Sequence, residues 1–459
     1  VSFDVEDMAA YDYVDQGCYV LEKGTYEIKL MNNAHDVLDS FTYDVEDTIV
    51  YNEDNARSSD KTAAVNTFDF AAGDVNYVSR SDWEGTLPTE RVEKKEATAE
   101  ILDQLNLDNI NKLYVNPSNE GDKITTGADN GLTLSDMAGV PYDDEKWDKL
   151  LDELSVDEMA KLMGYGGFST VEIASIGKVA TIDIDGPAGL NALTSDISGV
   201  QFPSEAVIGS TYNVDLVDEM GQTYAQEANA HGVVGLYAPG LNIHRTPFSG
   251  RNFEYYSEDP VLNGKLGAAM TRGCNSMGVY CYPKHFALND QETNRSGVCV
   301  WSNEQAMREI YLKAFEIVVK EGNNHGLMSS YNRIGTVWSG GCEALLTDVL
   351  RGEWGFEGAV ATDYANAKLL NADQALMAGG DLMLSTTGAT LSERVTGSVE
   401  GQQKLRQAAK DVLYMVVNSR AYTDPVEMGF PYWILAQVAL NIVLMLLVVL
   451  RIFKKKKIK

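Results

Sequence analysis

The sequence predicts an α/β protein: a (β/α)8 TIM-like barrel over 147–422, preceded by a short β segment over 1–51 and followed by a transmembrane helix over 432–450. Strand-like and helix-like segments alternate over roughly 270 residues, which is the length and rhythm of this barrel. Several of the apolar strands end in charged or polar residues, as barrel strands do where active sites lie. The nineteen residues of 432–450 carry no charge, which predicts the final helix.

Residues 1–51 alternate between apolar and polar positions as β strands do, with a turn at Glu22-Lys23-Gly24. They are too few to form a sheet core alone. Because the chain also opens on Val, we expect a fragment of a longer chain, with the missing strands upstream of residue 1. Residues 52–146 are polar and acidic, and we expect a partly ordered connecting region with one short helix near 98–107.

Within 147–422, strands are predicted at 179–184, 233–238, 278–282, 326–330 and 358–362. Helices are predicted at 216–230, 302–321 and 405–417, and Ser155 with Glu158 fits a capping box for an earlier one. The pattern is clearest at 302–321, where apolar residues recur with helical spacing. We expect Ser302 to cap that helix and Gly322 to follow its end.

The uncharged run at 432–450 is apolar on all faces, which favours a membrane span over a buried amphipathic helix of the soluble fold. Tyr432 and Trp433 would lie at one interface and the basic tail 451–459 at the other. The positive-inside rule places the tail in the cytoplasm and the barrel outside. We therefore predict a cell-membrane protein with a single-pass C-terminal anchor and the lipid bilayer as a partner.

The composition bounds the function. A net charge of −30 argues against nucleic acid as a partner. None of the five cysteines lies in a C-x-x-C pair, so no metal or redox motif is present, and disulfide pairing stays open. We expect no metal ion and no organic cofactor. The oligomeric state stays open.

The first candidate for chemistry is Asp363, which follows the predicted strand at 358–362. A carboxylate at the end of a buried strand is costly to desolvate, so it is usually paired, ligating or catalytic. The alternative is a structural Asp that caps the next helix. Lys284 and His285 follow the strand at 278–282, and a nearby cation keeps a carboxylate ionised and disfavours a metal dication. Lys284 alone would also fit a Schiff-base aldolase.

Three more positions could bind a ligand. Asp185 lies in an Asp-Gly-Pro turn, where it could satisfy its own backbone or grip two hydroxyls of a polyol. Arg251 lies in a Gly- and Pro-containing loop with Glu254, which suits either ligand binding or an internal ion pair. Tyr331 could donate a hydrogen bond to Asp363.

Together these blocks resemble glycoside hydrolase family 3, of the β-glucosidase type. The resemblance covers about 147–422 and rests on the strings PGLNIHRTPFSGRNFEYYSEDP, KHFALNDQETNR and LMSSYN and on the late block around Asp363. Residues 1–51 are similar to the final strands of the fibronectin-III-like domain that accompanies these enzymes. Here that piece precedes the barrel, which resembles the inverted domain order of some bacterial members.

The resemblance implies that Asp363 is the nucleophile. It also implies that the sugar-binding residues of the −1 subsite are Asp185, Arg251, Lys284, His285, Met328 and Tyr331. Two positions depart from the family pattern: Tyr364 stands where Trp is usual beside the sugar, and Asn191 stands where Arg is usual. The family's acid/base carboxylate lies in an α/β-sandwich domain that is absent here. We expect it upstream of residue 1, nominate no acid/base, and expect this fragment alone to be inactive.

The resulting hypothesis is a retaining exo-β-glycosidase, a β-glucosidase that hydrolyses terminal non-reducing β-D-glucosyl residues of a β-glucoside or oligosaccharide through a covalent glycosyl-enzyme on Asp363. Two alternatives stay open. One is the Schiff-base aldolase that uses Lys284, and the other is a membrane-tethered sugar-binding remnant without activity.

Overall fold

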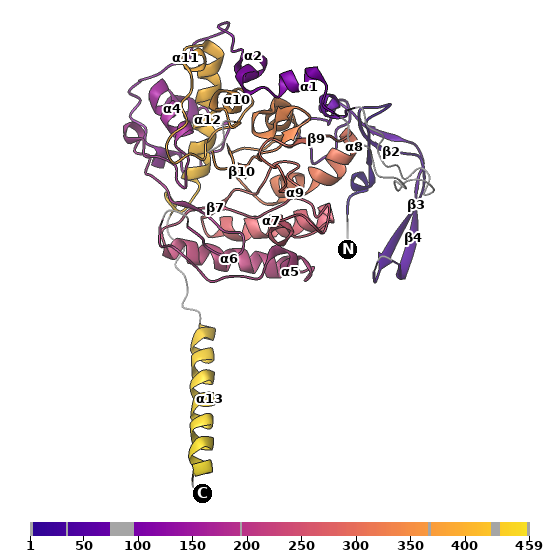
Figure 1. Cartoon of the computed structure of the whole chain (residues 1–459), viewed down its shortest axis with the longest axis vertical. Coiled ribbons are helices and arrows are strands. Elements are labelled where there is room, and N and C mark those ends of the chain that lie inside the picture. The colour runs from indigo at the N-terminus through magenta and orange to yellow at the C-terminus, as the bar shows by residue number, and fades with distance from the viewer. Residues whose placement is uncertain are drawn as a thin grey trace. The chain divides into compact units, whose positions relative to one another are not determined.

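The computed structural model describes residues 3–33, 35–73, 96–192, 195–365, 369–423 and 432–456, with side chains of the last helix described for 437–451 (Figure 1). The chain divides into two compact units, Val1–Thr423 and Asp424–Lys459. The first contains all the strands, and the second contains the helix α13 (Tyr432–Lys456). The domain boundaries expected at 51, 146 and 422 stay predictions.

The N-terminal residues form two small antiparallel sheets. Strands β1 (Ala10–Asp12), β2 (Cys18–Leu21) and β5 (Ile49–Tyr51) make one, and the hairpin of β3 (Gly24–Met31) and β4 (Val37–Val45) makes the other. The first sheet buries a small cluster that includes Tyr11, Tyr19 and Leu21. A 3₁₀ turn, η1 (Val5–Met8), precedes it. The alternating pattern thus produces β structure here, as the sequence predicts.

Between these sheets and the barrel lie short elements: η2 (Asp69–Ala71), α1 (Ala99–Gln104), η3 (Leu107–Asn109), α2 (Ile110–Tyr114) and η4 (Leu134–Met137). The short helix expected near 98–107 is confirmed as α1. The Thr98 side chain accepts a hydrogen bond from the Ile101 N–H, which caps one of its free amide groups.

Parallel strands form most of a barrel. Strands β6 (Asp183–Asp185), β7 (Gly235–Tyr237) and β8 (Tyr280–Cys281) pair in that order, and β10 (Gly326–Met328) pairs with β13 (Ala359–Ala361). The two groups join where the Met328 N–H donates to the Pro283 carbonyl, at 3.0 Å. Ala361 of β13 forms a parallel β-bridge with Leu382. Segment 382–385 is therefore the next member of the barrel wall, which forms a closed ring.

The ring closes through segment 163–173, where it departs from the all-parallel barrel that the sequence predicts. The Met383 N–H donates to Met163 O, and the Gly166 N–H donates to Met383 O, both at 2.8 Å. Beyond this point the segment turns back at η5 (Ala174–Ile176) and runs antiparallel to the stretch that enters β6, with the Asp183 N–H donating to Phe168 O at 3.0 Å. A connection this tight can join only antiparallel segments.

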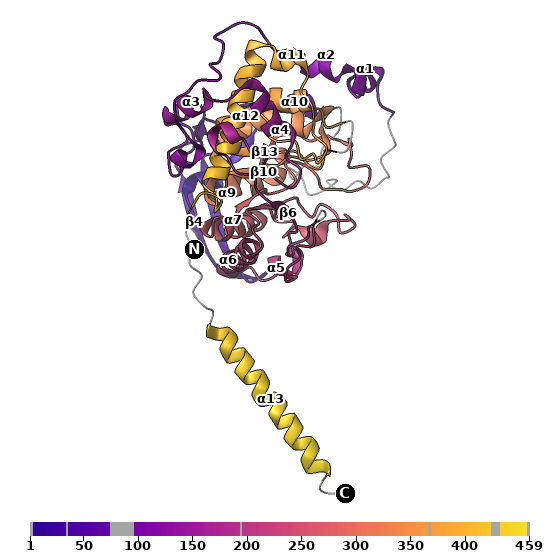
Figure 2. The same ribbon diagram turned by 90° about the vertical axis from the view of Figure 1, so that its left-hand side faces the viewer.

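Helices follow the strands and cover the ring, and Figures 1 and 2 both show α6, α7 and α9 stacked on one side of it. The helices of this part are α3 (Lys146–Leu151), α4 (Val156–Gly164), α5 (Glu205–Gly209), α6 (Val214–Ala230), α7 (Pro260–Ser276), α8 (Glu304–Ala306), α9 (Lys313–Glu321), α10 (Ala372–Met377), α11 (Glu393–Thr396), α12 (Val399–Val417) and the π-helices η7 (Met307–Tyr311) and η9 (Ala344–Glu353). The remaining short elements are η6 (Asn252–Glu254), β9 (Cys299–Val300), β11 (Arg333–Ile334), β12 (Val337–Trp338) and η8 (Ser339–Gly341).

Two capping predictions have different outcomes. The capping box of Ser155 and Glu158 is confirmed at the start of α4. The predicted cap Ser302 is wrong, because the Asn303 side chain accepts from the Ala306 N–H at 2.8 Å instead. The predicted helix at 302–321 also contains the π turn η7, so it is not one regular α-helix.

The prediction of a transmembrane helix over 432–450 is wrong. No helix in the described parts of the chain is both long enough and apolar enough to cross a membrane. The side chains of Tyr432, Trp433 and 452–459 lie outside the described residues. The predictions of a cell-membrane location, a single-pass anchor and a bilayer partner depended on this helix, and they are wrong for the same reason.

Candidate active site

All eight residues that the sequence nominates line one pocket of about 380 Å³ at the carboxyl ends of the barrel strands. They are Asp185, Arg251, Lys284, His285, Met328, Tyr331, Asp363 and Tyr364. The carboxyl ends of parallel strands meet at one face of a barrel, which explains why residues far apart in sequence gather here. Their individual roles stay predictions.

Asp363 follows β13 and is the most deeply buried carboxyl group facing the pocket. Its Oδ1 accepts the Tyr364 N–H at 2.7 Å. Its Oδ2 is buried and has no hydrogen-bond partner within the described chain. Burial raises the pKa of Asp363, and the nearby Arg295, Lys284 and Arg251 partly oppose that rise by favouring the charged form.

Lys284 lies between two carboxylates. Its Nζ is 2.7 Å from Asp185 Oδ1 and 3.2 Å from Glu254 Oε1. Burial disfavours its charge, yet the two carboxylates more than compensate and raise the pKa of Lys284 above its ordinary value. The ammonium group is therefore a fixed positive charge at the base of the pocket.

Arg251 and Glu254 form a two-pronged ion pair, with Nε to Oε2 at 2.6 Å and Nη2 to Oε1 at 2.8 Å. Burial raises the pKa of the Glu254 carboxyl, but Lys284 and Arg251 outweigh it and hold that pKa below the ordinary value. The internal ion pair, one of the two roles that the sequence left open for Arg251, is thus present. Glu254 in turn joins Arg251 to Lys284, so these two basic groups are held in one network.

His285 is buried beside this network. Its Nε2 lies 3.8 Å from Asp363 Oδ2, and its Nδ1 lies 3.2 Å from the Tyr255 hydroxyl. Burial lowers the pKa of His285 well below its usual range, and Arg251, Lys284 and Arg295 lower it further. The imidazole is therefore neutral at physiological pH and can serve as a hydrogen-bonding group.

Tyr331 does not donate to the Asp363 carboxylate, as the sequence had suggested, but to the backbone carbonyl of Tyr364. The guanidinium of Arg295 lies over the Tyr331 ring, 4.8 Å from its centre. Tyr364 places its ring 6.0 Å from that of Phe168, and its hydroxyl lies 3.1 Å from Thr386 Oγ1. These contacts fix an aromatic wall beside Asp363.

Sequence reasoning missed five residues that also line the pocket: Phe168, Tyr237, Glu292, Arg295 and Leu384. Two of them stand in the string KHFALNDQETNR, so their spacing after Lys284 could have identified them. Arg295 pairs with Glu292 at 3.3 Å and reaches Asp363. Phe168, which has a left-handed backbone with φ of 58°, carries no readable signal.

A metal site is not evident. Within the described residues, no group of three or more His, Cys, Asp or Glu side chains is placed to hold a metal ion. The pocket combines carboxylates, an ammonium group, guanidinium groups and aromatic rings, a set suited to a polyhydroxylated ligand.

A barrel with this cluster at its mouth has the architecture of a glycoside hydrolase, and comparison with known families agrees. The model of the glycosyl hydrolase family 3 N-terminal domain matches residues 171–415. The chain therefore belongs to glycosyl hydrolase family 3, as the resemblance in its motifs indicated.

Similar proteins share more than this domain. β-Glucosidase A of Butyrivibrio fibrisolvens is 34% identical over 379 residues, which cover 79% of this chain and 44% of the relative. β-Glucosidase 3B of Thermotoga neapolitana, solved with α-D-glucose, is 34% identical with a TM-score of 0.54 over 61% of this chain and 43% of that one. A β-glucosidase from Paenibacillus barengoltzii has a TM-score of 0.71 at 28% identity, over 93% of this chain and 48% of that one. The chain thus spans less than half the length of these relatives.

Proposed function

We propose that the protein is a retaining exo-β-glucosidase in which Asp363 is the nucleophile. The observation that carries this proposal is the buried Asp363 Oδ2, which has no hydrogen-bond partner in the described chain and faces a pocket lined by hydroxyl-binding groups. The relatives named β-glucosidase support the same activity. The pocket volume of about 380 Å³ suits one terminal sugar of a β-glucoside or oligosaccharide.

In the first step, Asp363 Oδ2 attacks the anomeric carbon of the terminal sugar. The bond from that carbon to the glycosidic oxygen breaks, and the leaving oxygen takes the bonding electrons and a proton from a general-acid carboxyl group, for which no residue of this chain is nominated. Positive charge develops on the sugar ring as this happens. Burial raises the pKa of Asp363, whereas the positive charges of Arg295, Lys284 and Arg251 limit that rise. These charges favour the carboxylate form that acts as the nucleophile.

In the second step, water gives a proton to the carboxylate form of that acid and attacks the anomeric carbon, and the bond to Asp363 breaks, which releases the sugar with its original configuration and restores the Asp363 carboxylate. Asp185, Lys284 and neutral His285 bind the sugar hydroxyls through both steps. Because the Glu254 network fixes the position of Lys284 before substrate arrives, little reorganisation is needed in the transition state.

The geometry argues against the aldolase alternative. A Schiff-base lysine must be neutral to attack a carbonyl, and such lysines have lowered pKa values. The pKa of Lys284 is instead raised, because Asp185 and Glu254 lie 2.7 and 3.2 Å from its Nζ. Borohydride reduction with a carbonyl substrate should therefore leave Lys284 unmodified.

The nucleophile is tested by covalent labelling with 2,4-dinitrophenyl 2-deoxy-2-fluoro-β-D-glucoside. Its leaving group departs without protonation, so the reaction depends on the nucleophile and the sugar-binding groups alone. Mass spectrometry should locate the fluorosugar on Asp363, and Asp363→Asn should abolish labelling.

The matched control is Glu292→Gln, which removes another carboxylate of the same pocket. This variant should still be labelled on Asp363. A sugar attached to Glu292, or saturable glucoside binding without any labelling, would reject the assignment; the second result would favour a sugar-binding protein without activity.

A further inference from the structure

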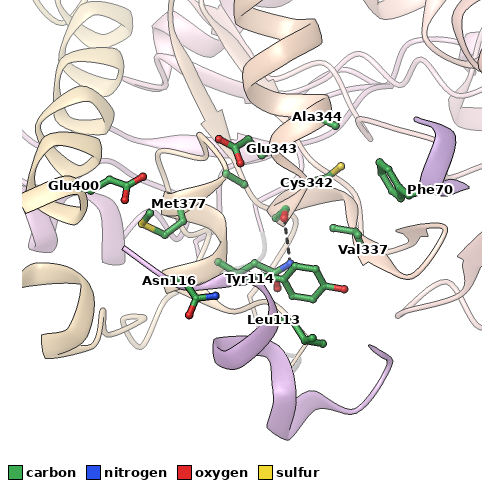
Figure 3. A pocket seen from close by; sticks show the side chains of 13 residues that line it. Phe70, Leu113, Tyr114, Asn116, Val337, Cys342, Glu343, Ala344, Met377 and Glu400 are labelled. Carbon is green, nitrogen blue, oxygen red and sulfur yellow. Dashed lines mark hydrogen bonds between the residues drawn. The ribbon is translucent and has the colours of Figure 1, made fainter. Parts of the chain in front are cut away.

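A second pocket of about 360 Å³, close in volume to the first, lies outside the barrel mouth (Figure 3). It is formed where η2 and α2 of the connecting region meet η8, η9, α10 and α12. The two pockets share no lining residue among those described. The proposed glucosidase mechanism does not use this pocket.

Aromatic and aliphatic side chains make one part of its wall. Phe70 is 42% exposed and Leu113 is 37% exposed, although residues of these types are usually buried. Tyr114 lies between them in the lining, and its ring is half-buried (Figure 3). An open aromatic face of this kind can pack against the apolar C–H face of a sugar ring.

Hydrogen-bonding groups make the other part. Glu343 is exposed, and its carboxylate makes no hydrogen bond or ion pair within the described chain. Glu400 uses its Oε2 to accept the Ser118 N–H at 2.7 Å. The Gln374 side chain is fixed, because its Nε2 donates to Gly341 O at 3.1 Å. Carboxylate and amide oxygens accept hydrogen bonds from hydroxyl groups.

The charge of the lining restricts the ligand. No basic side chain is present among the described residues that line this pocket, and two glutamates are. Phosphates and acidic sugars would be repelled. A cation would gain little from the exposed carboxylate of Glu343, since exposed ion pairs are weak, and it would leave the aromatic wall unused. A neutral polyhydroxylated ligand can pack against the aromatic part of the wall and donate hydrogen bonds to the carboxylate and amide oxygens of the other part.

We propose that this pocket is a second saccharide-binding site, which holds a neutral oligosaccharide away from the nucleophile. The choice of ligand rests on the proposed glucosidase function. The chain connects the two sites directly: Tyr331 lines the first pocket, and Val337 of β12, a few residues later, lines the second. An oligosaccharide bound in the second pocket would thus contact a strand that lies a few residues after Tyr331 of the catalytic pocket.

The test uses the methyl groups of two methionines as reporters, since Met377 lines the second pocket and Met328 the first. The full chain carrying Asp363→Asn is titrated with cellotetraose and observed by ¹³C-methyl NMR. The Met377 resonance should shift in a saturable way, and excess glucose should displace ligand from Met328 more readily than from Met377. An unresponsive Met377 overturns the proposal.

The double variant Phe70→Ala/Glu343→Gln should weaken the Met377 response at least tenfold. The control Tyr212→Ala/Asp215→Asn changes an exposed aromatic and an exposed carboxylate elsewhere and should leave it unchanged. Equal responses in both variants overturn the proposal, as does a Met377 shift with spermidine but not with cellotetraose. Failure of Asp363 labelling with an intact Met377 response rejects the proposed function only.

Discussion

Arg295 Nη1 lies 3.8 Å from Asp363 Oδ2, and neither atom makes a hydrogen bond within the described chain. Asp363 follows strand β13 and Arg295 lies in a loop, yet the arginine is the foremost of the charges that lower the pKa of Asp363 against the effect of burial. The electrostatic state of the proposed nucleophile therefore depends on a residue in the loop after His285.

The first prediction concerns Arg295→Met. Removing the positive charge raises the pKa of Asp363, so less of it is ionised at a given pH. The rate of labelling by the fluorosugar should fall, and its acidic limb should move to higher pH. Arg295→Lys keeps a positive charge and should move the limb less. Equal limbs for the wild-type chain and Arg295→Met would show that the arginine does not act on Asp363.

The second prediction concerns His285, whose pKa is lowered well below its usual range by burial and by three neighbouring cations. The imidazole should stay neutral between pH 5.5 and pH 8, so no part of the pH dependence of labelling in that range belongs to it. ¹⁵N NMR of the imidazole should show no titration there. A midpoint near pH 6.5 would contradict the neutral assignment.

The third prediction concerns Asp290, which is 5% exposed and accepts the Ile243 N–H at 3.0 Å. Burial raises its pKa to about 7, against the smaller effects of that hydrogen bond and Arg245. A carboxyl group whose pKa rises on folding destabilises the fold as pH increases from its unfolded pKa of about 4 towards its folded pKa.

Asp290→Asn should accordingly stabilise the protein at pH 8, by on the order of a few kcal/mol since one pKa unit is worth about 1.4 kcal/mol. At pH 4 the effect should be much smaller, because Asp290 is then protonated in the folded state and about half protonated in the unfolded state. Urea unfolding at the two pH values measures the difference. A stabilisation of the same size at both would show that the carboxyl group is not the cause.

The fourth prediction concerns Glu316, a buried carboxylate paired with Arg57 at 2.8 Å, Lys320 at 2.7 Å and Lys313 at 3.1 Å. Burial acts to raise its pKa, but the three cations lower it far below the ordinary value. Glu316→Gln removes a buried carboxylate that pairs with buried Arg57 and with the partly buried Lys313 and Lys320, and it should cost about 3–5 kcal/mol at pH 7.

A carboxyl group whose pKa falls on folding stabilises the fold above its unfolded pKa, and that contribution is lost as pH falls towards the folded pKa. The difference between wild type and Glu316→Gln in urea unfolding should therefore shrink below about pH 4.3. The control is Glu321→Gln, in the exposed pair with Lys265, which should cost under about 1 kcal/mol. A similar cost for both variants would contradict the assigned role of burial.

Much of the site could be predicted from the sequence, because active-site residues of a parallel barrel lie at the carboxyl ends of its strands. Those ends can be recognised where an apolar strand pattern stops at a polar residue. Asp185, Lys284 and Asp363 follow that rule, and the structure gathers them with the other nominated residues. Arg295 reaches the pocket from a loop, and no periodic pattern gives the path of a loop. Phe168 reaches it only because the ring closes through an antiparallel turn, which is set by tertiary contacts with segment 382–385.

The errors have similar causes. Ser302 and Asn303 are both good capping residues, and only the backbone geometry selects between neighbours. The π turn η7 depends on how the helix packs and has no clear sequence pattern. The span predicted at 432–450 rested on the absence of charged residues, and no helix in the described parts of the chain is both long enough and apolar enough to cross a membrane.

The hydrogen bonds that join Met383 to Met163 and Gly166 bear on how the protein is made. Since they join the first and last segments of the ring, a nascent chain cannot complete the barrel until residues near 385 have left the ribosome. Until then, the apolar faces of the earlier strands have no final partner and are exposed to aggregation or chaperones. Synthesis paused before that point should yield a protease-sensitive intermediate, and release beyond it should yield a resistant one.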